Sequence, residues 1–331
     1  MDETPNSPRA IVARGLTKTY GDFTAVDGID LDVFTGETFG FLGPNGAGKS
    51  TTIKMLCTLT APSAGTATVA GHDIVAQRTD VRRHIGLVFQ DTTLDGYLSA
   101  EQNLRFHGEL YGIPHHQLDD RMRAVLDMVG LWERRGDKVQ NFSGGMKRRL
   151  EIARGLMHSP RVLFLDEPTV GLDPQTRSSI WAYIHELRRA EKITIFLTTH
   201  YMDEAEHCDR IAIMDSGKVV VLDTPTALKS TVGVDRVRLH TTDDAAAIAA
   251  LASQCQIDAT PLPDGGIEFG VADGERFVPT LFSKLDLGIR SVSVTRPSLD
   301  DVFMSYTGRT IRDSEASATD RNRVFTAGFR R

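Results

Sequence analysis

The stretch Gly43-Pro44-Asn45-Gly46-Ala47-Gly48-Lys49-Ser50-Thr51 has the residue types and spacing of a loop that holds nucleotide phosphates. Its glycines allow consecutive backbone N–H groups to turn inward around an anion, and a helix that follows adds the positive end of its dipole. Lys49 can reach the β- and γ-phosphates, and the Ser50 hydroxyl can bind Mg²⁺. An apolar run at 38–42 precedes the loop and a helical pattern begins at Thr52. The sequence therefore predicts a site for ATP or GTP between a strand and a helix.

Four short apolar runs are typical of buried strands in a parallel sheet. They cover Phe39–Leu42, Ile85–Phe89, Val162–Leu165 and Ile193–Leu197, and they lead into the phosphate loop, Gln90, Asp166-Glu167 and His200. Ligands of open α/β sheets bind beyond the carboxyl ends of the strands. We therefore expect these groups to meet at one edge of a sheet.

Asp166 and Glu167 supply two carboxylates at the end of the third run. An Asp in this place beside a phosphate loop can hold Mg²⁺, directly or through water. Glu167 is expected to face the other way and to polarise the attacking water, a general-base role worth roughly 10²–10⁴ in rate. The alternative interpretation is an acidic helix start, with Pro168 setting the turn.

Ser143-Gly144-Gly145 opens a helical pattern that we predict over Lys147–Met157. Ser143 can cap that helix, and the two glycines leave N–H groups exposed at the positive end of its dipole. Such a tripeptide is common in loops. Its position between the phosphate loop and the Asp166-Glu167 strand makes it specific.

With these motifs in this order, the chain resembles the ATP-binding-cassette ATPases over roughly residues 9–230. The resemblance implies an α/β fold: a P-loop nucleotide-binding domain of the ABC type with a helical subdomain at about 92–158. It implies ATP and Mg²⁺ as cofactors, with Ser50, Gln90 and Asp166 around the metal. It also implies that Tyr20 stacks on adenine, that Gln90 senses Mg²⁺ and the lytic water, and that His200 contacts the γ-phosphate. Ser143, Gly144 and Gly145 form the signature motif of the family. Asp173 matches a loop that connects the two active sites.

In this family two cassettes pair head to tail, and each ATP lies between the phosphate loop of one and the signature helix of the other. This chain has a single phosphate loop, so a second copy of itself is the simplest expected partner. No apolar run approaches the roughly 20 residues that cross a bilayer. The resemblance therefore implies a separate integral-membrane permease that holds the chain at the cytoplasmic face of the membrane.

The overall composition and charge indicate a globular protein and argue against nucleic-acid binding, a secretory signal and disulfides. The 331 residues, 40% hydrophobic and 25% charged, suggest about two ordinary globular domains. A net charge of −6 gives no general attraction to nucleic acid, which we do not expect as a partner. The polar residues 1–8 do not form a secretory signal. Cys57, Cys208 and Cys255 are isolated from one another and are expected to be free thiols.

Two segments resemble the exporter branch that includes the daunorubicin-resistance ATPases, namely 91–112 and 296–308. In that family the first segment belongs to the helical subdomain, which receives a coupling helix of the membrane subunit. We expect local core positions at Leu104, Leu110, Val125, Leu126 and Val129, and a docking groove beside Gln90. For the second segment the resemblance implies a role in dimer stability or membrane-subunit contact, and a short helix capped by Ser298 is the local alternative.

Beyond Ser230 the pattern is strand, helix, strand, strand, helix, strand. The expected elements are Val232–His240, Ala245–Gln254, Cys255–Thr260, Gly266–Val271, Glu275–Leu287 and Ile289–Arg296. This order is compatible with a small ferredoxin-like α+β accessory domain at 231–308. Residues 309–331 are polar and charged and are expected to form a disordered tail.

The leading hypothesis is the ATP-hydrolysing subunit of an export complex for a drug-like or lipid-like substrate. An importer ATPase is the main competitor, and only the two exporter-like segments oppose it. ATPases of this family that act on ribosomes or DNA usually have two cassettes, a long coiled-coil insertion or zinc modules, and we find none of these in the sequence. A regulator that binds nucleotide without turnover is disfavoured by the intact Glu167 and His200.

Overall fold

The parallel sheet predicted from the apolar runs is the centre of the larger of two compact units. The computed structural model describes residues 8–263, 265–284 and 288–308. One unit ends at Thr224, and the second begins at Pro225. The predicted tail, 309–331, lies outside the described residues.

The central sheet has six strands in the order β10-β9-β3-β8-β7-β6. All four predicted strands are present, and they pair in parallel, so this prediction is confirmed. Only β10 runs antiparallel to its neighbour, β9. The bounds are β3 Thr38–Leu42, β6 Ile85–Val88, β7 Val162–Asp166, β8 Thr194–Thr199, β9 Arg210–Asp215 and β10 Lys218–Asp223.

Aromatic packing explains why these strands are continuous apolar runs. The ring of Phe196 in β8 lies 5.5 Å from that of Phe39, 5.6 Å from that of Phe41 and 5.4 Å from that of Phe164, centroid to centroid. All four rings are fully buried. Because both faces of a parallel sheet are covered, strand residues on either face are apolar. The carboxyl ends of β3, β7 and β8 are thereby held in register.

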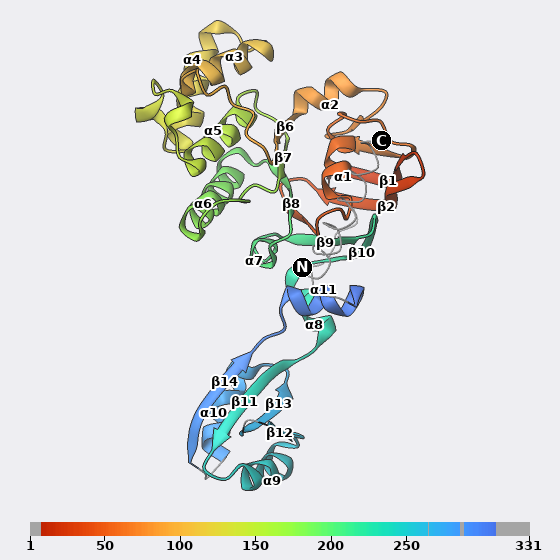
Figure 1. Ribbon diagram of the computed structural model, residues 1–331, viewed down its shortest axis with the longest axis vertical. Coiled ribbons are helices and arrows are strands. Elements are labelled where there is room, and N and C mark those ends of the chain that lie inside the picture. The colour runs from red at the N-terminus through yellow and green to blue at the C-terminus, as the bar shows by residue number, and fades with distance from the viewer. Residues whose placement is uncertain (1–7, 264, 285–287, 309–331) are drawn as a thin grey trace, which may run out of the picture. The chain divides into compact units, whose positions relative to one another are not determined.

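A second, antiparallel sheet has the order β2-β1-β4-β5. Its strands are β1 Arg9–Tyr20, β2 Phe23–Phe34, β4 Ala64–Val69 and β5 His72–Asp73. Buried residues alternate along β2 at Ile29, Leu31 and Val33, as in a sheet with one face on the core. The helix α1 (Lys49–Leu56) starts at the phosphate loop and lies beside this sheet in Figure 1.

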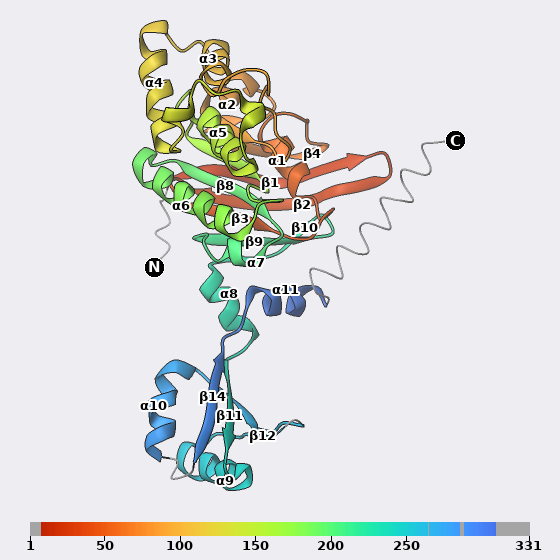
Figure 2. The ribbon, with the colours of Figure 1, turned by 60° about the vertical axis from the view of Figure 1, so that its left-hand side comes forward.

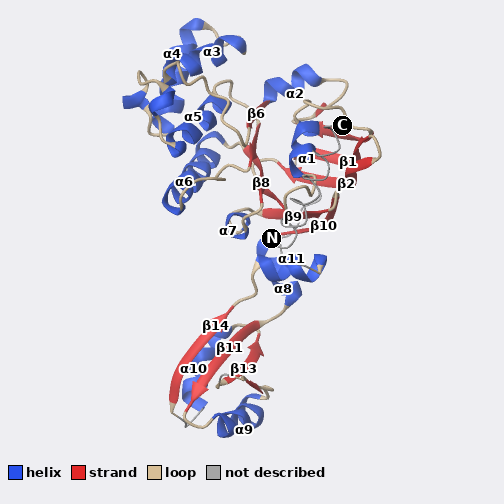
Figure 3. Ribbon diagram, in the orientation of Figure 1, coloured by secondary structure: helices blue, strands red, loops and turns tan. Residues whose placement is uncertain are grey.

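Helices make up the part of this unit that lies away from the second sheet. Figure 3 shows α3 to α6 gathered on one side of β6 to β8. Their bounds, with the smaller helices, are α2 Arg78–His84, α3 Ala100–Leu110, α4 His115–Met128, α5 Gly144–Leu156, α6 Pro174–Glu191 and α7 Met202–Ala205, with 3₁₀ turns at Trp132–Arg134 and Val139–Asn141. The helix predicted at Lys147 begins at Gly144, because Ser143 caps it there, its Oγ accepting a hydrogen bond from the Met146 N–H at 3.3 Å.

One of the five predicted core positions in this region is wrong. Leu104, Val125, Leu126 and Val129 are buried, but the side chain of Leu110 is 71% exposed. Leu104 and Leu110 are six residues apart on α3. At 3.6 residues a turn they point about 120° apart around the helix axis. Leu110 therefore faces away from the side that packs.

The second unit has a four-stranded antiparallel sheet with the order β12-β13-β11-β14. The elements are β11 Asp235–Thr241, α9 Asp244–Cys255, β12 Thr260–Pro261, β13 Ile267–Val271, α10 Gly274–Lys284 and β14 Ile289–Thr295. This is the predicted β-α-β-β-α-β order, with the first and last strands adjacent as Figure 2 shows. The strand predicted at Cys255–Thr260 is wrong in extent, because α9 includes Cys255, residues 256–259 form no strand, and β12 consists of Thr260 and Pro261.

Two further helices complete the second unit. They are α8 (Pro225–Val232) and α11 (Leu299–Thr307), and they pack against each other. Ser298 caps α11 in a capping box with Asp301, as the local interpretation predicted.

The remaining predictions on the chain as a whole concern membrane crossing and cysteines. Across the described helices, none is both long and apolar enough to cross a bilayer. All three cysteines are free thiols, as predicted: Cys57 and Cys208 are buried and Cys255 is half-buried.

Candidate functional site

The phosphate loop folds as a strand-to-helix turn in which glycine is required. Gly46 and Gly48 have φ values of 81° and 112°. A Cβ added at Gly48 would lie 2.4 Å from the carbonyl oxygen of Ala25, so no larger residue fits there. Lys49 follows at the start of α1 and is 4% exposed. Its Nζ donates hydrogen bonds to the carbonyls of Gly43 at 2.7 Å and Pro44 at 3.1 Å, which places the ammonium inside the loop.

Asp166, the last residue of β7, is held between two hydroxyl groups. Its Oδ1 accepts hydrogen bonds from Ser50 Oγ at 3.1 Å and from Thr198 Oγ1 at 2.6 Å. A hydroxyl and a carboxylate oxygen are ligands that Mg²⁺ prefers. No cluster of three or more His, Cys, Asp and Glu side chains suited to a metal occurs in the described part of the chain. The Ser50 hydroxyl and the Asp166 carboxylate therefore fit two of the ligands of a Mg²⁺ ion.

Glu167 turns toward the lysine and the histidine. Its Oε1 lies 3.5 Å from Lys49 Nζ and 3.3 Å from His200 Nδ1. Nδ1 is buried, and this close contact is not aligned as a hydrogen bond. Burial raises the pKa of Glu167, but the His200 ring and the Lys49 ammonium outweigh it and leave the pKa below its usual value. The carboxylate is therefore ionised at neutral pH, as a base must be.

A buried glutamate that the sequence analysis missed lies behind His200. Glu204 in α7 accepts a hydrogen bond from Thr199 Oγ1 at 2.8 Å and another from Thr169 Oγ1. Burial raises the pKa of this carboxyl, although Thr199 and Arg177 oppose the shift. Thr169 follows the Asp166-Glu167 turn and Thr199 precedes His200, so Glu204 ties these two segments together.

Gln90 lies beside the signature helix of its own chain. It follows β6 and is exposed. It lines a hollow of about 200 Å³ with eight other residues: Thr92, Gly144, Arg148, Glu151, Pro168, Val170, Gly171 and Leu172. The hollow beside Gln90 is thus formed by the signature helix and the turn after Glu167. Docking of a membrane subunit in it stays a prediction.

The described contacts do not join the signature motif, Tyr20 or Asp173 to the group formed by the phosphate loop, Asp166, Glu167 and His200. Ser143 caps α5, and in Figure 1 the strands β6 to β8 lie between α5 and α1. Tyr20 ends β1 with half its surface exposed, and Lys18 Nζ lies 5.0 Å from its ring centre. Asp173 caps α6, its Oδ1 accepting from the Thr176 N–H at 3.0 Å. Within one chain, the phosphate loop thus meets Asp166, Glu167 and His200 but not the signature motif.

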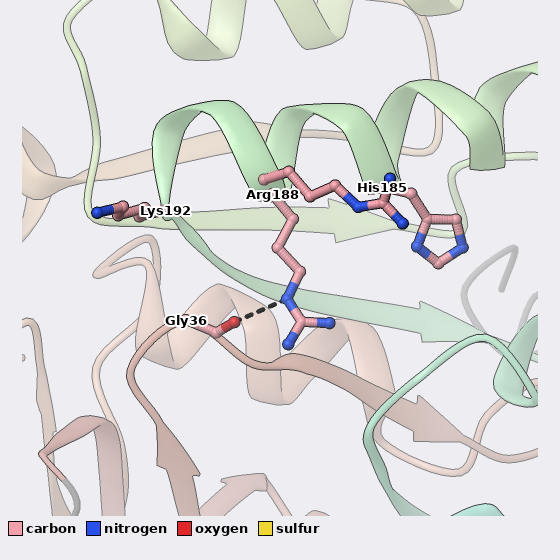
Figure 4. Close-up of a pocket in the computed structure, with 5 residues that line it drawn as sticks. Gly36, His185, Arg188 and Lys192 are labelled. Atoms are coloured by element: carbon pink, nitrogen blue, oxygen red, sulfur yellow. Dashed lines mark hydrogen bonds between the residues drawn. The ribbon is translucent and has the colours of Figure 1, made fainter.

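A second hollow lies at the opposite ends of the strands. It is lined by Gly36, His185, Arg188, Arg189 and Lys192 (Figure 4). Arg188 Nε donates to the Gly36 carbonyl at 2.8 Å, and its Nη2 lies 2.8 Å from Asp209 Oδ2. No predicted site residue lines this hollow. Its central arginine ties α6 to the turn before β3 and acts as a structural link.

Family models match both units. A model described as ABC transporter matches residues 26–170, and one described as ATP-binding protein DrrA1-3-like, C-terminal domain, matches residues 224–307.

Similar proteins extend over almost the whole chain. The linearmycin resistance ATP-binding protein LnrL of Bacillus subtilis is 39% identical and covers 91% of this chain and 99% of its own length. The daunorubicin/doxorubicin resistance ATP-binding protein DrrA of Streptomyces peucetius is 40% identical over 96% of this chain and 98% of its own. The Nod factor export ATP-binding protein I of Cupriavidus metallidurans is 38% identical over 91% and 98%.

Solved structures match about two thirds of the chain. Among them, cbiO1 of Clostridium perfringens, part of the ABC transporter complex cbiONQ, has a TM-score of 0.64 and 30% identity over 67% of this chain and 91% of its own. A dimeric ATP-binding cassette, MJ0796, in a post-hydrolysis state with ADP and phosphate, has a TM-score of 0.59 and 27% identity over 65% and 98%.

Proposed function

The chain belongs to the ABC transporter family of ATP-binding proteins and is an ATPase, and from this premise we propose that it drives an export complex for a drug-like or lipid-like substrate. Similar proteins named for linearmycin resistance, daunorubicin resistance and Nod factor export support this direction of transport. Their similarity includes the second unit, because each covers at least 91% of the chain.

The contact of Glu167 with both Lys49 and His200 carries the proposal for hydrolysis. With ATP bound, Lys49 pairs with the β- and γ-phosphates. The ionised Glu167 accepts a proton from the attacking water, whose oxygen bonds to the γ-phosphorus as the bond from that phosphorus to ADP breaks. His200 lies beside this carboxylate and contacts the γ-phosphate. Ser50 Oγ and Asp166, with Gln90, would hold Mg²⁺, and the ion would supply positive charge to the phosphate oxygens. Tyr20 stacks on the adenine through its exposed ring.

A second copy of the chain supplies the missing half of each nucleotide site. The N-terminus of α5 has a serine and two glycines, which suit a phosphate group, yet strands separate it from its own phosphate loop (Figure 1). A head-to-tail pair places Ser143 to Gly145 of one copy against the ATP of the other, with Asp173 near the junction. The dimeric form of the MJ0796 cassette supports such pairing.

An integral-membrane permease binds the chain through exposed apolar side chains on and near α3. Tyr97 is 80% exposed, Phe106 is 66% exposed and Leu110 is 71% exposed. Phe106 and Leu110 are four residues apart and lie on one face of α3. Large apolar groups exposed together, as Phe106 and Leu110 are, mark a protein interface. The permease thereby holds the chain peripherally at the cytoplasmic face of the membrane.

The test uses the full chain co-purified with the permease produced from a neighbouring gene. We expect ATP hydrolysis that the transported compound stimulates and that Lys49→Ala abolishes. No hydrolysis by the intact complex would refute the proposal.

Permease binding is tested separately with Leu110→Asp, which should lower the amount of co-purified permease at least about tenfold, since a charge in an interface core is strongly unfavourable. The matched control is Leu59→Asp, another leucine with half its surface exposed, outside the helical region. Equal recovery of the permease with both variants would contradict docking at α3.

A further inference from the structure

The signature helix α5 contains a buried ion pair that the mechanism above does not use. Arg148 is 6% exposed and Glu151 is 1% exposed. Arg148 Nη1 donates to Glu151 Oε2 at 3.1 Å, one helical turn away. Burying two charges is costly unless their remaining hydrogen-bonding groups are also satisfied. The other hydrogen-bond partners of Arg148 and Glu151 therefore show which segments of the chain this ion pair positions.

Arg148 binds the backbone on both sides of the catalytic glutamate. Its Nε donates to the Pro168 carbonyl at 2.6 Å, and its Nη2 donates to the Asp166 carbonyl at 3.1 Å. Glu167 lies between these two carbonyls and has a φ of 47°, in the left-handed region that side chains seldom adopt. The guanidinium thus fixes the turn that aims the Glu167 carboxylate.

The same pair holds both sides of the Gln90 segment. Arg148 Nη1 donates to the carbonyl of Phe89, the residue before Gln90. Glu151 Oε1 accepts a hydrogen bond from the Thr93 N–H at 2.8 Å. Arg154, one turn further along α5, donates to the Thr93 carbonyl at 2.9 Å. Gln90 is thereby held by the signature helix from either end.

We propose that Arg148 and Glu151 are positioning residues that couple the signature helix to Gln90 and Glu167 of the same chain. This inference rests on the proposed function, in which the N-terminus of α5 contacts the ATP of the second copy. A shift of α5 when that ATP binds moves the guanidinium, and with it both catalytic segments. Nucleotide at one site thus prepares the base and the glutamine of the other, so turnover depends cooperatively on ATP.

Arginine is needed because its planar group presents several N–H donors in fixed directions. Lysine keeps the charge for Glu151 but cannot reach three carbonyls in three directions at once. Arg148→Lys is therefore the first variant. Arg148→Met with Glu151→Met is the second, because removing both charges of a buried pair leaves neither unpaired. Thermal unfolding of each variant shows that it is folded.

Arg149→Met provides the matched control. Arg149 is the next residue of α5, and its Nη1 donates to the Val129 carbonyl and to Tyr183 Oη, each at 3.0 Å. These partners belong to the helical region and not to the nucleotide edge. The control removes the same side chain from the same helix while leaving Gln90 and Glu167 held.

The readouts are ATP affinity by calorimetry, and kcat, KM and the Hill coefficient of ATP hydrolysis by the permease complex. For both Arg148 variants we expect kcat to fall on the order of 10²-fold, the effect of a base displaced by about 1 Å, and the Hill coefficient to approach 1. ATP affinity should stay within about threefold, because Lys49 and its loop are unchanged.

Three outcomes would overturn the coupling. In the first, the Arg148 variants match Arg149→Met in both kcat and Hill coefficient. In the second, they lose ATP binding together with turnover, which means that the pair serves the fold as a whole. In the third, the wild-type complex itself does not hydrolyse ATP, and the proposed function then fails along with the coupling. Wild-type turnover with unaffected Arg148 variants refutes the coupling alone.

Discussion

The nucleotide edge of the parallel sheet and the second unit differ in what they bury. The nucleotide edge buries the charged side chains of Lys49, Arg148, Glu151, Asp166, Glu167 and Glu204. In the described part of the second unit, Thr241 is the one buried polar side chain, and the core consists of residues such as Val237, Leu239 and Phe269.

This difference separates chemistry from packing. A buried charge destabilises a fold unless other groups pair with it. A cluster of buried charged side chains therefore indicates a functional site. The second unit, with its apolar core, is stabilised by packing and contains no such cluster among its described residues. We therefore expect changes at the nucleotide edge to alter activity and changes in the second unit to alter stability.

Glu167→Gln should have the largest effect. It removes the base and keeps the side-chain size, so turnover should fall roughly 10²–10⁴-fold while ATP binding persists. The variant should accumulate as an ATP-bound dimer on size-exclusion chromatography. Undiminished phosphate release would remove Glu167 from the role of base.

Lys49→Ala should come next. It removes the cation for the phosphates and leaves Glu167 with one fewer charge partner, so ATP affinity by calorimetry should weaken on the order of 10²-fold or more. Lys54→Ala, an exposed lysine of the same helix, is the control and should bind ATP normally. Similar affinity in the two variants would contradict the phosphate site.

Phe269→Ala tests the other side of the comparison. Phe269 is 3% exposed and packs edge-on against Phe277. Its loss should lower the free energy of unfolding of the second unit by about 3–5 kcal/mol, with ATP affinity unchanged. Phe282→Ala, at a 58% exposed phenylalanine, should change little in the same denaturant titration. A large loss of ATP binding in Phe269→Ala would break the separation of chemistry from packing.

Ser298→Ala should have the smallest effect. It removes the cap of α11 and should cost about 1 kcal/mol of stability in a denaturant titration. Ser305→Ala, an exposed serine within the same helix, should cost nothing or stabilise slightly. Equal stability of the two variants would show that the capping box is not important.

Much of the fold follows from short-range sequence patterns. The four parallel strands and the order of elements in the second unit could be predicted, because runs of apolar residues and turn residues are local signals. The antiparallel sheet of β1, β2, β4 and β5 was not predicted. Leu110 was misplaced because its neighbours along α3, and not its own type, decide which face packs.

The candidate site divides in the same way. The phosphate loop and Asp166-Glu167 could be found because each is one continuous motif. Their roles in binding and hydrolysis stay predictions, which the Lys49 and Glu167 variants test. Arg148 and Glu204 were missed because their partners are distant in sequence, such as Phe89 for Arg148 and Thr169 for Glu204. The pair Arg148 and Glu151 does have a local signal. An Arg and a Glu lie one turn apart on the buried face of the helix that the signature motif begins.

The left-handed backbone at Glu167 has a consequence for the durability of the protein. A side chain held at such a φ costs about 1–3 kcal/mol, and glycine would remove that cost. The most direct way to relieve this strain therefore also removes the base. Selection for thermal stability alone would favour glycine at position 167 and would thereby inactivate the protein. Thermostable variants of the chain must therefore gain their stability at other positions.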